Sequence, residues 1–178
     1  MMKLIIVTGM PGAGKEELLN VAKGMGMPFV RMGDIVRDAY ELRDISQKDM
    51  SVGEFAESER KRNGYDIWAK RSLKKMSGPV FLVDGCRSMD EVEAFRSLTD
   101  DVVIVAVHSS PAARYERLIK RNRDDAPSDT REFRERDDRE IGWGIAVTIA
   151  MADIVIPNET SLDDLRALSK KILERLRS

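Results

Sequence analysis

The chain has 178 residues, which is long enough for one domain with a full-sized apolar core. Its 30 basic residues nearly balance its 31 acidic ones, so no overall charge attracts nucleic acid or an anionic membrane, and we expect neither as a partner. Cys86 is the only cysteine, which excludes an internal disulfide. The sequence contains no secretion-signal pattern and no apolar run of transmembrane length, so we expect a cytoplasmic protein.

Short apolar runs recur along the chain and are typical of buried parallel strands. They cover residues 4–8, 29–31, 80–83, 102–107 and 154–156. Helical patterns lie between them, and the last one is expected to place an apolar stripe on one face, formed by Leu162, Leu165, Leu168, Ile172 and Leu176. This alternation predicts an α/β fold built on a parallel sheet with right-handed crossovers.

A glycine-rich segment directly follows the first predicted strand and has the pattern G-x-x-x-x-G-K. Glycines let backbone N–H groups wrap around phosphate oxygens, and the following helix directs its positive end at the same anion. Lys15 would reach the terminal phosphates of a nucleoside triphosphate. An ordinary turn explains neither this lysine nor its position. The predicted phosphate-binding residues are Gly9, Met10, Pro11, Gly12, Ala13, Gly14 and Lys15.

Glu16 departs from this motif, because the next position normally carries Ser or Thr, whose hydroxyl holds Mg²⁺. A carboxylate is itself a good oxygen ligand for Mg²⁺. It can also point into solvent as an acidic residue in the first turn of the helix. Both roles stay open for Glu16.

Two segments between predicted strands are longer than a crossover connection between parallel strands needs to be. Residues 34–76 contain two helical stretches, at about 51–62 and 65–76, broken at Asn63 and Gly64, and we expect a cover over the substrate. Residues 117–140 form a second, charged insert. At its start, Arg117 and Arg121 share one helix face with the preceding Arg114.

A break at residues 123–128 separates this helix from a second one that contains Arg131, Arg134, Arg136 and Arg139. One interpretation is a solvated helical hairpin held by ion pairs. The other is a lid that brings arginines to phosphate and excludes water during phosphoryl transfer.

Polar residues near the ends of the second and third strands are further candidates. Asp34 can cap a helix with Arg37 paired to it, or Arg37 can clamp the phosphate of an acceptor. Asp84 ends a strand beside the phosphate loop, where it is either a ligand of Mg²⁺ or its water, or a turn residue, with Arg87 on the acceptor side. We expect Cys86 to be packed.

Residues at the ends of the last two strands have less specific patterns. His108 is the only histidine, and we assign it no role because no partner set accompanies it. Asn158 either borders the nucleotide base or forms a turn.

Taken in order, these segments resemble the nucleoside monophosphate kinase group of P-loop proteins. They are especially similar to an archaeal adenylate-kinase-related, dephospho-CoA-kinase-like uncharacterised family. The matching segments are 9–15, 33–37, 84–87, 117–123, 136–139 and 152–158. The resemblance implies one three-layer P-loop domain over 1–178, with a five-stranded parallel sheet in the order 2-3-1-4-5. It also implies an acceptor-binding insert at about 34–76, a lid at about 117–140, and the cofactors ATP and Mg²⁺.

The resemblance also assigns roles residue by residue. Lys15 would bind the transferred phosphoryl group, and Arg37 and Arg87 would grip the acceptor monophosphate. Arg117 and Arg121 match lid arginines that contact ATP. The later lid arginine is best matched by Arg136, with Arg139 as the alternative register.

Together these implications predict an ATP-dependent kinase that acts on a small nucleotide or a nucleotide-like acceptor. Because Glu16 replaces the usual Ser or Thr, the alternative is a nucleotide-binding switch or adaptor, or a slow ATPase. The near-neutral charge argues against a third possibility, an RNA-associated ATPase.

Overall fold

The computed structural model describes residues 2–44, 49–121 and 126–178. At its centre lies a sheet of five parallel strands in the order β2-β3-β1-β4-β5, which confirms the expected topology. The strands begin and end within one residue of the predicted runs. They are β1 (Lys3–Thr8), β2 (Phe29–Arg31), β3 (Val80–Asp84), β4 (Val102–His108) and β5 (Ile154–Pro157).

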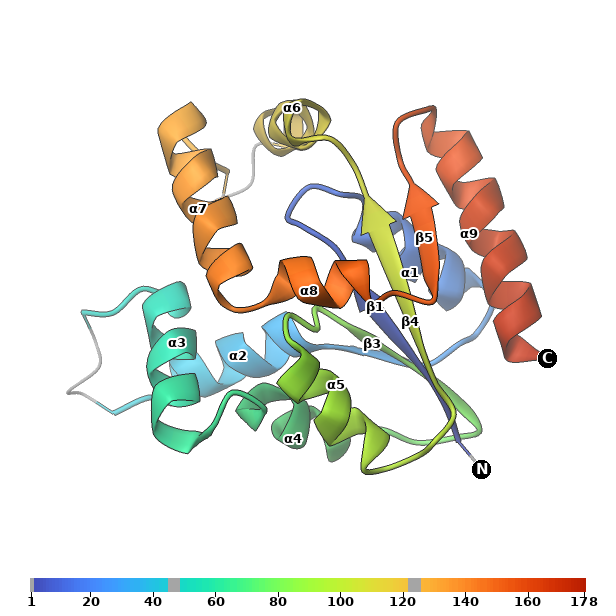
Figure 1. Cartoon of the computed structure of the whole chain (residues 1–178), viewed down its shortest axis with the longest axis horizontal. Helices are drawn as coiled ribbons and strands as arrows, with labels where there is room; N and C mark the ends of the chain where they lie inside the picture. Colours follow the sequence, from blue (N-terminus) through green and yellow to red (C-terminus); the bar gives the residue numbers. More distant parts are fainter. Residues whose placement is uncertain (1, 45–48, 122–125) are drawn as a thin grey trace.

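Helices cover both faces of this sheet (Figure 1). One face packs against α1 (Lys15–Gly24) and α9 (Leu162–Arg177). The other packs against α2 (Met32–Glu41), α3 (Val52–Asn63), α4 (Ile67–Leu73) and α5 (Met89–Arg96). The remaining helices are α6 (Pro111–Arg121), α7 (Thr130–Gly142) and α8 (Ile145–Ala150), and α6 and α7 stand above the carboxyl ends of the strands.

The position of β1 in the middle of the sheet explains why its sequence is continuously apolar. Leu4 and Ile6 belong to the core under α2–α5, whereas Ile5 and Val7 belong to the core under α1 and α9. All four side chains are completely buried. Successive side chains of a strand point to opposite faces, so a strand covered on both sides needs apolar residues at every position.

The structure confirms most of the predicted apolar stripe of the last helix, because Leu165, Leu168, Ile172 and Leu176 pack in the core, and corrects it at one position. Leu162 is 47% exposed at the start of α9, so it does not belong to the buried face. Leu173, which the prediction omitted, is fully buried with Leu165 and Leu176. The buried face therefore runs 165, 169, 173 and 176, and Ser169 provides a small residue within it.

The two expected inserts differ in how much of them the structure describes. The first contains α2, α3 and α4, and α3 ends at Asn63, where Gly64 adopts φ +101° and breaks the helix as expected. In the second insert, the break between two helices that was predicted at residues 123–128 lies partly outside the described residues. Among the described helices, none has both the length and the apolar character to cross a bilayer.

Candidate functional site

The phosphate-binding loop joins the end of β1 to the start of α1. Gly9 and Gly14 adopt φ values of +147° and +110°. A Cβ atom at Gly9 would lie 2.3 Å from the carbonyl oxygen of Val107, and one at Gly14 would lie 2.4 Å from Nδ2 of Asn158. Both positions therefore require glycine. Gly14 also precedes α1 without offering a side-chain cap, which leaves amides of the first turn for an anion.

Lys15 lies at the start of α1 and folds back over the loop. Its Nζ atom donates to the carbonyl oxygens of Gly9 at 2.6 Å and Met10 at 3.3 Å. Burial lowers the pKa of this amine, while the negative charge of Asp84 acts in the opposite direction. Because these two hydrogen bonds go to neutral carbonyl oxygens, the ammonium group can exchange them for charged phosphate oxygens.

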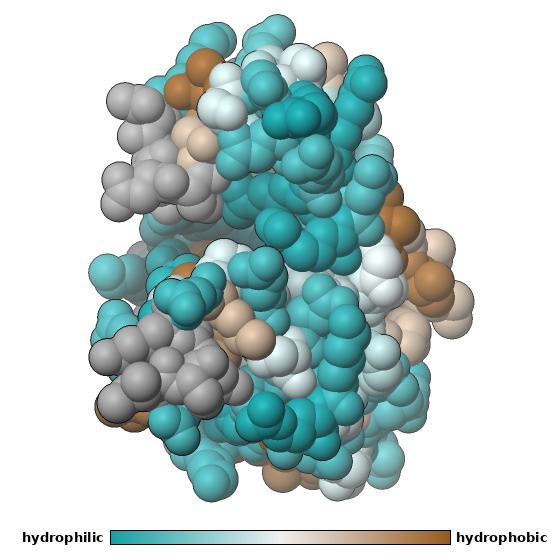
Figure 2. Space-filling model, turned by 90° about the vertical axis from the view of Figure 1, so that its left-hand side faces the viewer, coloured by the Kyte–Doolittle hydropathy of each residue, from teal (hydrophilic) through white to brown (hydrophobic). Residues whose placement is uncertain are grey.

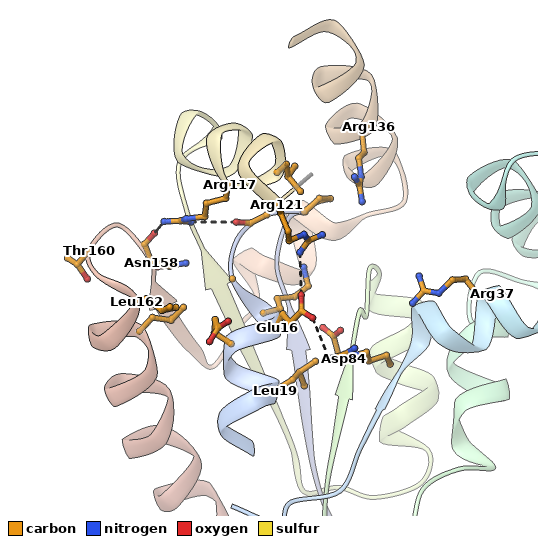
Figure 3. A pocket seen from close by; sticks show the side chains of 18 residues that line it. Glu16, Leu19, Arg37, Asp84, Arg117, Arg121, Arg136, Asn158, Thr160 and Leu162 are labelled. Atoms are coloured by element: carbon orange, nitrogen blue, oxygen red, sulfur yellow. Dashed lines mark hydrogen bonds and ion pairs between the residues drawn. The ribbon is translucent and has the colours of Figure 1, made fainter. Parts of the chain in front are cut away.

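A cavity of about 450 Å³ opens beside this loop (Figure 3). Predicted site residues converge on it from α1, α2, β3, α6, α7 and the turn after β5. Those that line it are Pro11, Gly12, Gly14, Lys15, Glu16, Arg37, Asp84, Arg117, Arg121, Arg136 and Asn158. Gly9, Met10, Ala13, Asp34 and Arg87 are not among its lining residues. Arg136 rather than Arg139 therefore faces the phosphate loop.

The cavity lies where parallel sheets usually bind ligands. From β1 the chain crosses to β2 on one side of the sheet, and after β3 it crosses to β4 on the other side of β1, so the direction of winding reverses beside β1, and the cavity opens at the carboxyl ends of these strands. The face that carries α3 and α7 is mainly hydrophilic and is hollowed between its upper and lower parts (Figure 2).

Glu16 points into the cavity, where two arginines surround its carboxylate. Arg121 of α6 approaches to 3.4 Å, and Arg31 at the end of β2 approaches to 4.0 Å (Figure 3). Glu16 is therefore not simply a solvent-facing acid of the first helical turn. In this arrangement it links α1 to α6 across the space where phosphates are expected.

Asp84 ends β3 and is almost fully enclosed. Burial raises the pKa of its carboxyl group, and the charges of Lys15 and Arg87 oppose this increase. Its Oδ1 atom is buried and has no hydrogen-bond partner in the described structure. A buried carboxylate oxygen without a donor fits a place beside Mg²⁺ or a water bound to Mg²⁺.

The rest of the cavity agrees with the way proteins bind Mg²⁺. No group of three or more His, Cys, Asp or Glu side chains gathers into a metal cage within the described ranges. Mg²⁺ usually needs only one or two carboxylates, because substrate phosphates and water complete its octahedron. Asp84 fits that role, whereas the carboxylate of Glu16 is engaged by arginines.

Arg117 and Asn158 brace the phosphate loop. The guanidinium of Arg117 donates to Oγ of Ser109 at 2.5 Å and to the carbonyl of Asn158 at 2.7 Å, and a longer bond of 3.5 Å reaches the carbonyl of Gly12. The Asn158 amide donates to the carbonyl of Ala13 at 2.9 Å. These bonds give both side chains a role in fixing the loop, even though both also line the cavity.

Arg114, which the sequence analysis did not single out as a site residue, holds α6, α7 and the loop together. It is 3% exposed and binds both carboxylate oxygens of Asp137 at 2.9 and 2.6 Å. It also donates to the carbonyl of Pro11 at 3.1 Å, and its guanidinium lies 5.0 Å from the ring centre of Phe133. A buried bidentate pair of this kind fixes the position of α7.

The two predicted acceptor arginines lie in different surroundings. Arg37 is exposed, lines the cavity and pairs with Asp34. Asp34 is not the helix cap, because α2 begins at Met32 with Arg31 in the capping position. Arg87 lies outside the cavity lining, and its Nε atom donates to Glu140 at 2.6 Å. Cys86 is buried as expected.

Comparisons with known proteins identify relatives of this chain. A protein of Hyperthermus butylicus described as "UPF0200 protein" is 42% identical over 176 residues, covering 97% of this chain and 94% of the relative. "UPF0200 protein TV0279" of Thermoplasma volcanium is 40% identical and covers 96% of both chains. A family model described as "AAA domain" matches residues 8–134.

Solved structures of low sequence identity share the fold. Shikimate kinase from Bacteroides thetaiotaomicron matches with a TM-score of 0.65 at 16% identity, covering 98% of this chain and 99% of that one. A gluconokinase from Sinorhizobium meliloti matches with a TM-score of 0.63 at 18% identity, covering 98% and 93%. The chain therefore belongs to the AAA domain family and to the UPF0200 protein family, and its fold is that of a P-loop kinase.

Proposed function

We propose that this protein is an ATP-dependent phosphotransferase that moves the γ-phosphoryl group to a small nucleotide or a nucleotide-like acceptor. The observation that carries the proposal is the convergence of Lys15, Arg121 and Arg136 from three helices on the cavity beside the glycine-rich loop. Phosphoryl transfer needs little covalent chemistry from the protein. It needs positive charge around the equatorial oxygens and reactants held in line.

ATP would place its phosphates on the loop amides and on Lys15, which would give up its carbonyl partners. Arg121 and Arg136 would offset the charge that develops on the transferred group. Arg117 would contribute mainly by holding Gly12 and Asn158 in place. Asp84 would hold Mg²⁺ or one of its waters, and this ion would supply further positive charge at the phosphates.

The acceptor would enter from the side of α2 and α3, which we assign as the acceptor-binding insert, while α6 and α7 would form the lid. Arg37 lies on the wall of the cavity that faces this side. Its exposed partner Asp34 can release it at little cost, because surface ion pairs contribute only about 0–1 kcal/mol. A phosphate on the acceptor would be a stronger, bidentate partner.

One observation supports a second function, a nucleotide-dependent switch with slow chemistry. Arg121, which phosphoryl transfer would use, is in contact with Glu16. If that contact persists with ATP bound, the protein would bind nucleotide but transfer its phosphate slowly. ATP binding that changes the hydrogen exchange of α7, without transfer to any acceptor, would favour this alternative.

A coupled assay of ATP turnover tests the main proposal with a panel of nucleoside monophosphates and dephospho-CoA. We expect turnover with at least one acceptor and a loss of about a hundredfold or more in Lys15→Ala, because this lysine contacts the transferred group. Lys23→Ala, an exposed change at the other end of α1, is the matched control and should behave like the wild type. Wild-type turnover no higher than that of Lys15→Ala for every acceptor would reject the kinase proposal.

A further inference from the structure

A second cavity, of about 540 Å³, lies between α2, α3 and α4, three helices that pack against one another (Figure 1). Small-molecule sites in proteins typically measure about 300–1,000 Å³ and have mainly apolar walls with a few polar groups. The second cavity shares no lining residue with the cavity beside the phosphate loop. It is therefore a separate candidate site of suitable size.

The second cavity lies behind Arg37. Ile35, Ala39 and Leu42 are spaced by four and three residues, so they lie on one side of α2 and line this cavity. Arg37 is two positions from Ile35, which is roughly 200° around a helix, so it lies on the opposite side. There it lines the phosphate-loop cavity (Figure 3). One helix thus forms a wall of both cavities.

The wall of the second cavity is apolar, and part of it is uncovered. Ile35 and Phe55 of α3 are 7% and 3% exposed. Leu42, at the end of α2, is 88% exposed, more than any other large apolar side chain in the parts of the chain that the structure describes. A single exposed leucine is common, but one that borders an apolar cavity offers contact area to the body of a ligand.

Cations outnumber carboxylates around this apolar wall. The charged residues that line the cavity are Arg43, Arg71, Lys74 and Lys75, with Asp38 and Glu59. The whole chain has a net charge of −1, so this excess of positive charge is local. It attracts an anionic ligand and repels a cationic one.

Two of these cations are available to an anion. Lys74, at the end of α4, has no ion-pair partner within the described residues. Lys75 pairs with Asp38 at 3.4 Å, but both side chains are exposed, and such a pair contributes little and is readily exchanged. Arg71 is held more firmly, by a carboxylate of α3 at 2.6 Å, so it remains part of the wall.

We propose that the second cavity binds a small amphipathic anion. Its aliphatic or aromatic body would lie against Leu42 and Phe55, and its acidic group would pair with Lys74 and Lys75. The inference goes beyond the proposed function and does not depend on it, because none of these residues takes part in phosphoryl transfer. The ligand would join the end of α2 to the end of α4, and so restrict the helix that presents Arg37 to the phosphate loop.

Calorimetry with 4-phenylbutanoate tests this inference at constant ionic strength. The neutral 4-phenylbutan-1-ol and the cationic 4-phenylbutylamine have the same apolar body, whereas acetate has only the acidic group. We expect saturable binding of 4-phenylbutanoate, at least about fivefold tighter than that of the alcohol or the amine, and no saturation with acetate. Absence of saturable binding, or binding no tighter than that of the alcohol, would overturn the inference.

Variants at exposed positions identify the contacts. Lys74→Glu should weaken binding about tenfold, because repulsion replaces attraction, and Asp38→Asn should strengthen it about threefold, because it releases a lysine. Leu42→Ser should weaken binding about threefold through lost apolar contact. Lys171→Glu on α9 and Val147→Ser on α8 are the matched controls, also at exposed positions, and should bind like the wild type.

Methyl NMR spectra locate the probe, because its phenyl ring shifts the resonances of methyl groups that it contacts. We expect saturable shifts at Ile35, Ala39 and Leu42. Leu19 and Leu162, which line the phosphate-loop cavity, should not shift. Shifts confined to Leu19 and Leu162 would place the probe in the other cavity and overturn the inference.

Lys15→Met separates the two cavities by affinity. Its binding of 4-phenylbutanoate should equal that of the wild type, whether or not the protein proves to be a kinase, because the phosphate loop is no part of the second cavity. Binding that is lost in Lys15→Met but unchanged in Lys74→Glu and Leu42→Ser would overturn the inference.

Discussion

Glu16 is the residue at which this site departs most from other P-loops. It stands where Ser or Thr usually binds Mg²⁺, and it lies next to Lys15 at the end of the helix that receives the phosphates. Its contacts with Arg31 and Arg121 offset its charge in the ligand-free protein. ATP would compete for the same arginines, so Glu16 should oppose the binding of metal-free ATP.

The two arginine contacts of Glu16 predict the effect of Glu16→Gln on nucleotide affinity. The change should raise the affinity for ATP in the presence of a chelator about tenfold, because it removes a negative charge near the phosphates. Affinity for ATP with Mg²⁺ should change much less, since the ion already offsets the phosphate charge. Calorimetry under both conditions measures the difference, with Glu93→Gln on α5 as the control. Equal changes with and without Mg²⁺ would contradict the predicted position of Glu16 beside the phosphates.

The sequence predicted single residues well where one short segment determines the geometry. Lys15 and its loop lie at the cavity because a strand, a glycine-rich turn and a helix follow one another directly. Arg60, Arg114 and Glu140 were missed because their partners lie 23 or more positions away. A weak signal existed for Arg60, which lies one helical turn after the buried Ala56 and so on the same helix face.

Helix α7 depends on buried ion pairs more than on apolar packing. Its buried residues are only Phe133 and Glu140. Arg114 anchors it through Asp137, and Arg87 anchors it through Glu140. Removing one partner of a buried pair is costly because the other charge stays buried without compensation. The position of α7 should therefore be sensitive to single charge changes.

Asp137→Asn tests this anchoring. Asn can accept only one of the two bonds from Arg114 and carries no charge, so we expect a loss of about 3 kcal/mol that acts mainly on α7. Hydrogen exchange should show faster exchange of α7 amides while α9 stays protected. Asp163→Asn, which alters an exposed ion pair on α9, is the matched control. Unchanged protection of α7 would contradict a role of this pair in holding it.

At the level of elements, the pattern of the sequence was most reliable for the strands. All five predicted runs became strands, and the central ones are apolar at nearly every position because helices cover the sheet on both sides. The stripe predicted for the last helix was wrong only at Leu162, which matches the spacing although it lies beyond the edge of the core. Helix α8, with six residues, is too short to show a helical period in the sequence.

For the whole molecule, the order of the strands came from the resemblance to P-loop kinases and not from the residues themselves. Periodicity identifies strands but does not show which of them pair, because β1, β3 and β4 are all similarly apolar. The order β2-β3-β1-β4-β5 places the loop after β1 between the ends of β3 and β4. This placement brings Asp84 and the helices after β4 to the same cavity as Lys15.

The central claim is that the amides and lysine of this loop enclose a polyphosphate. Calorimetry of the wild-type chain and of Lys15→Met, with ATP and with GTP, in the presence and absence of Mg²⁺, tests it most directly. We expect a heat of association for at least one triphosphate and its loss in Lys15→Met. Absence of association with both nucleotides under both conditions would contradict it.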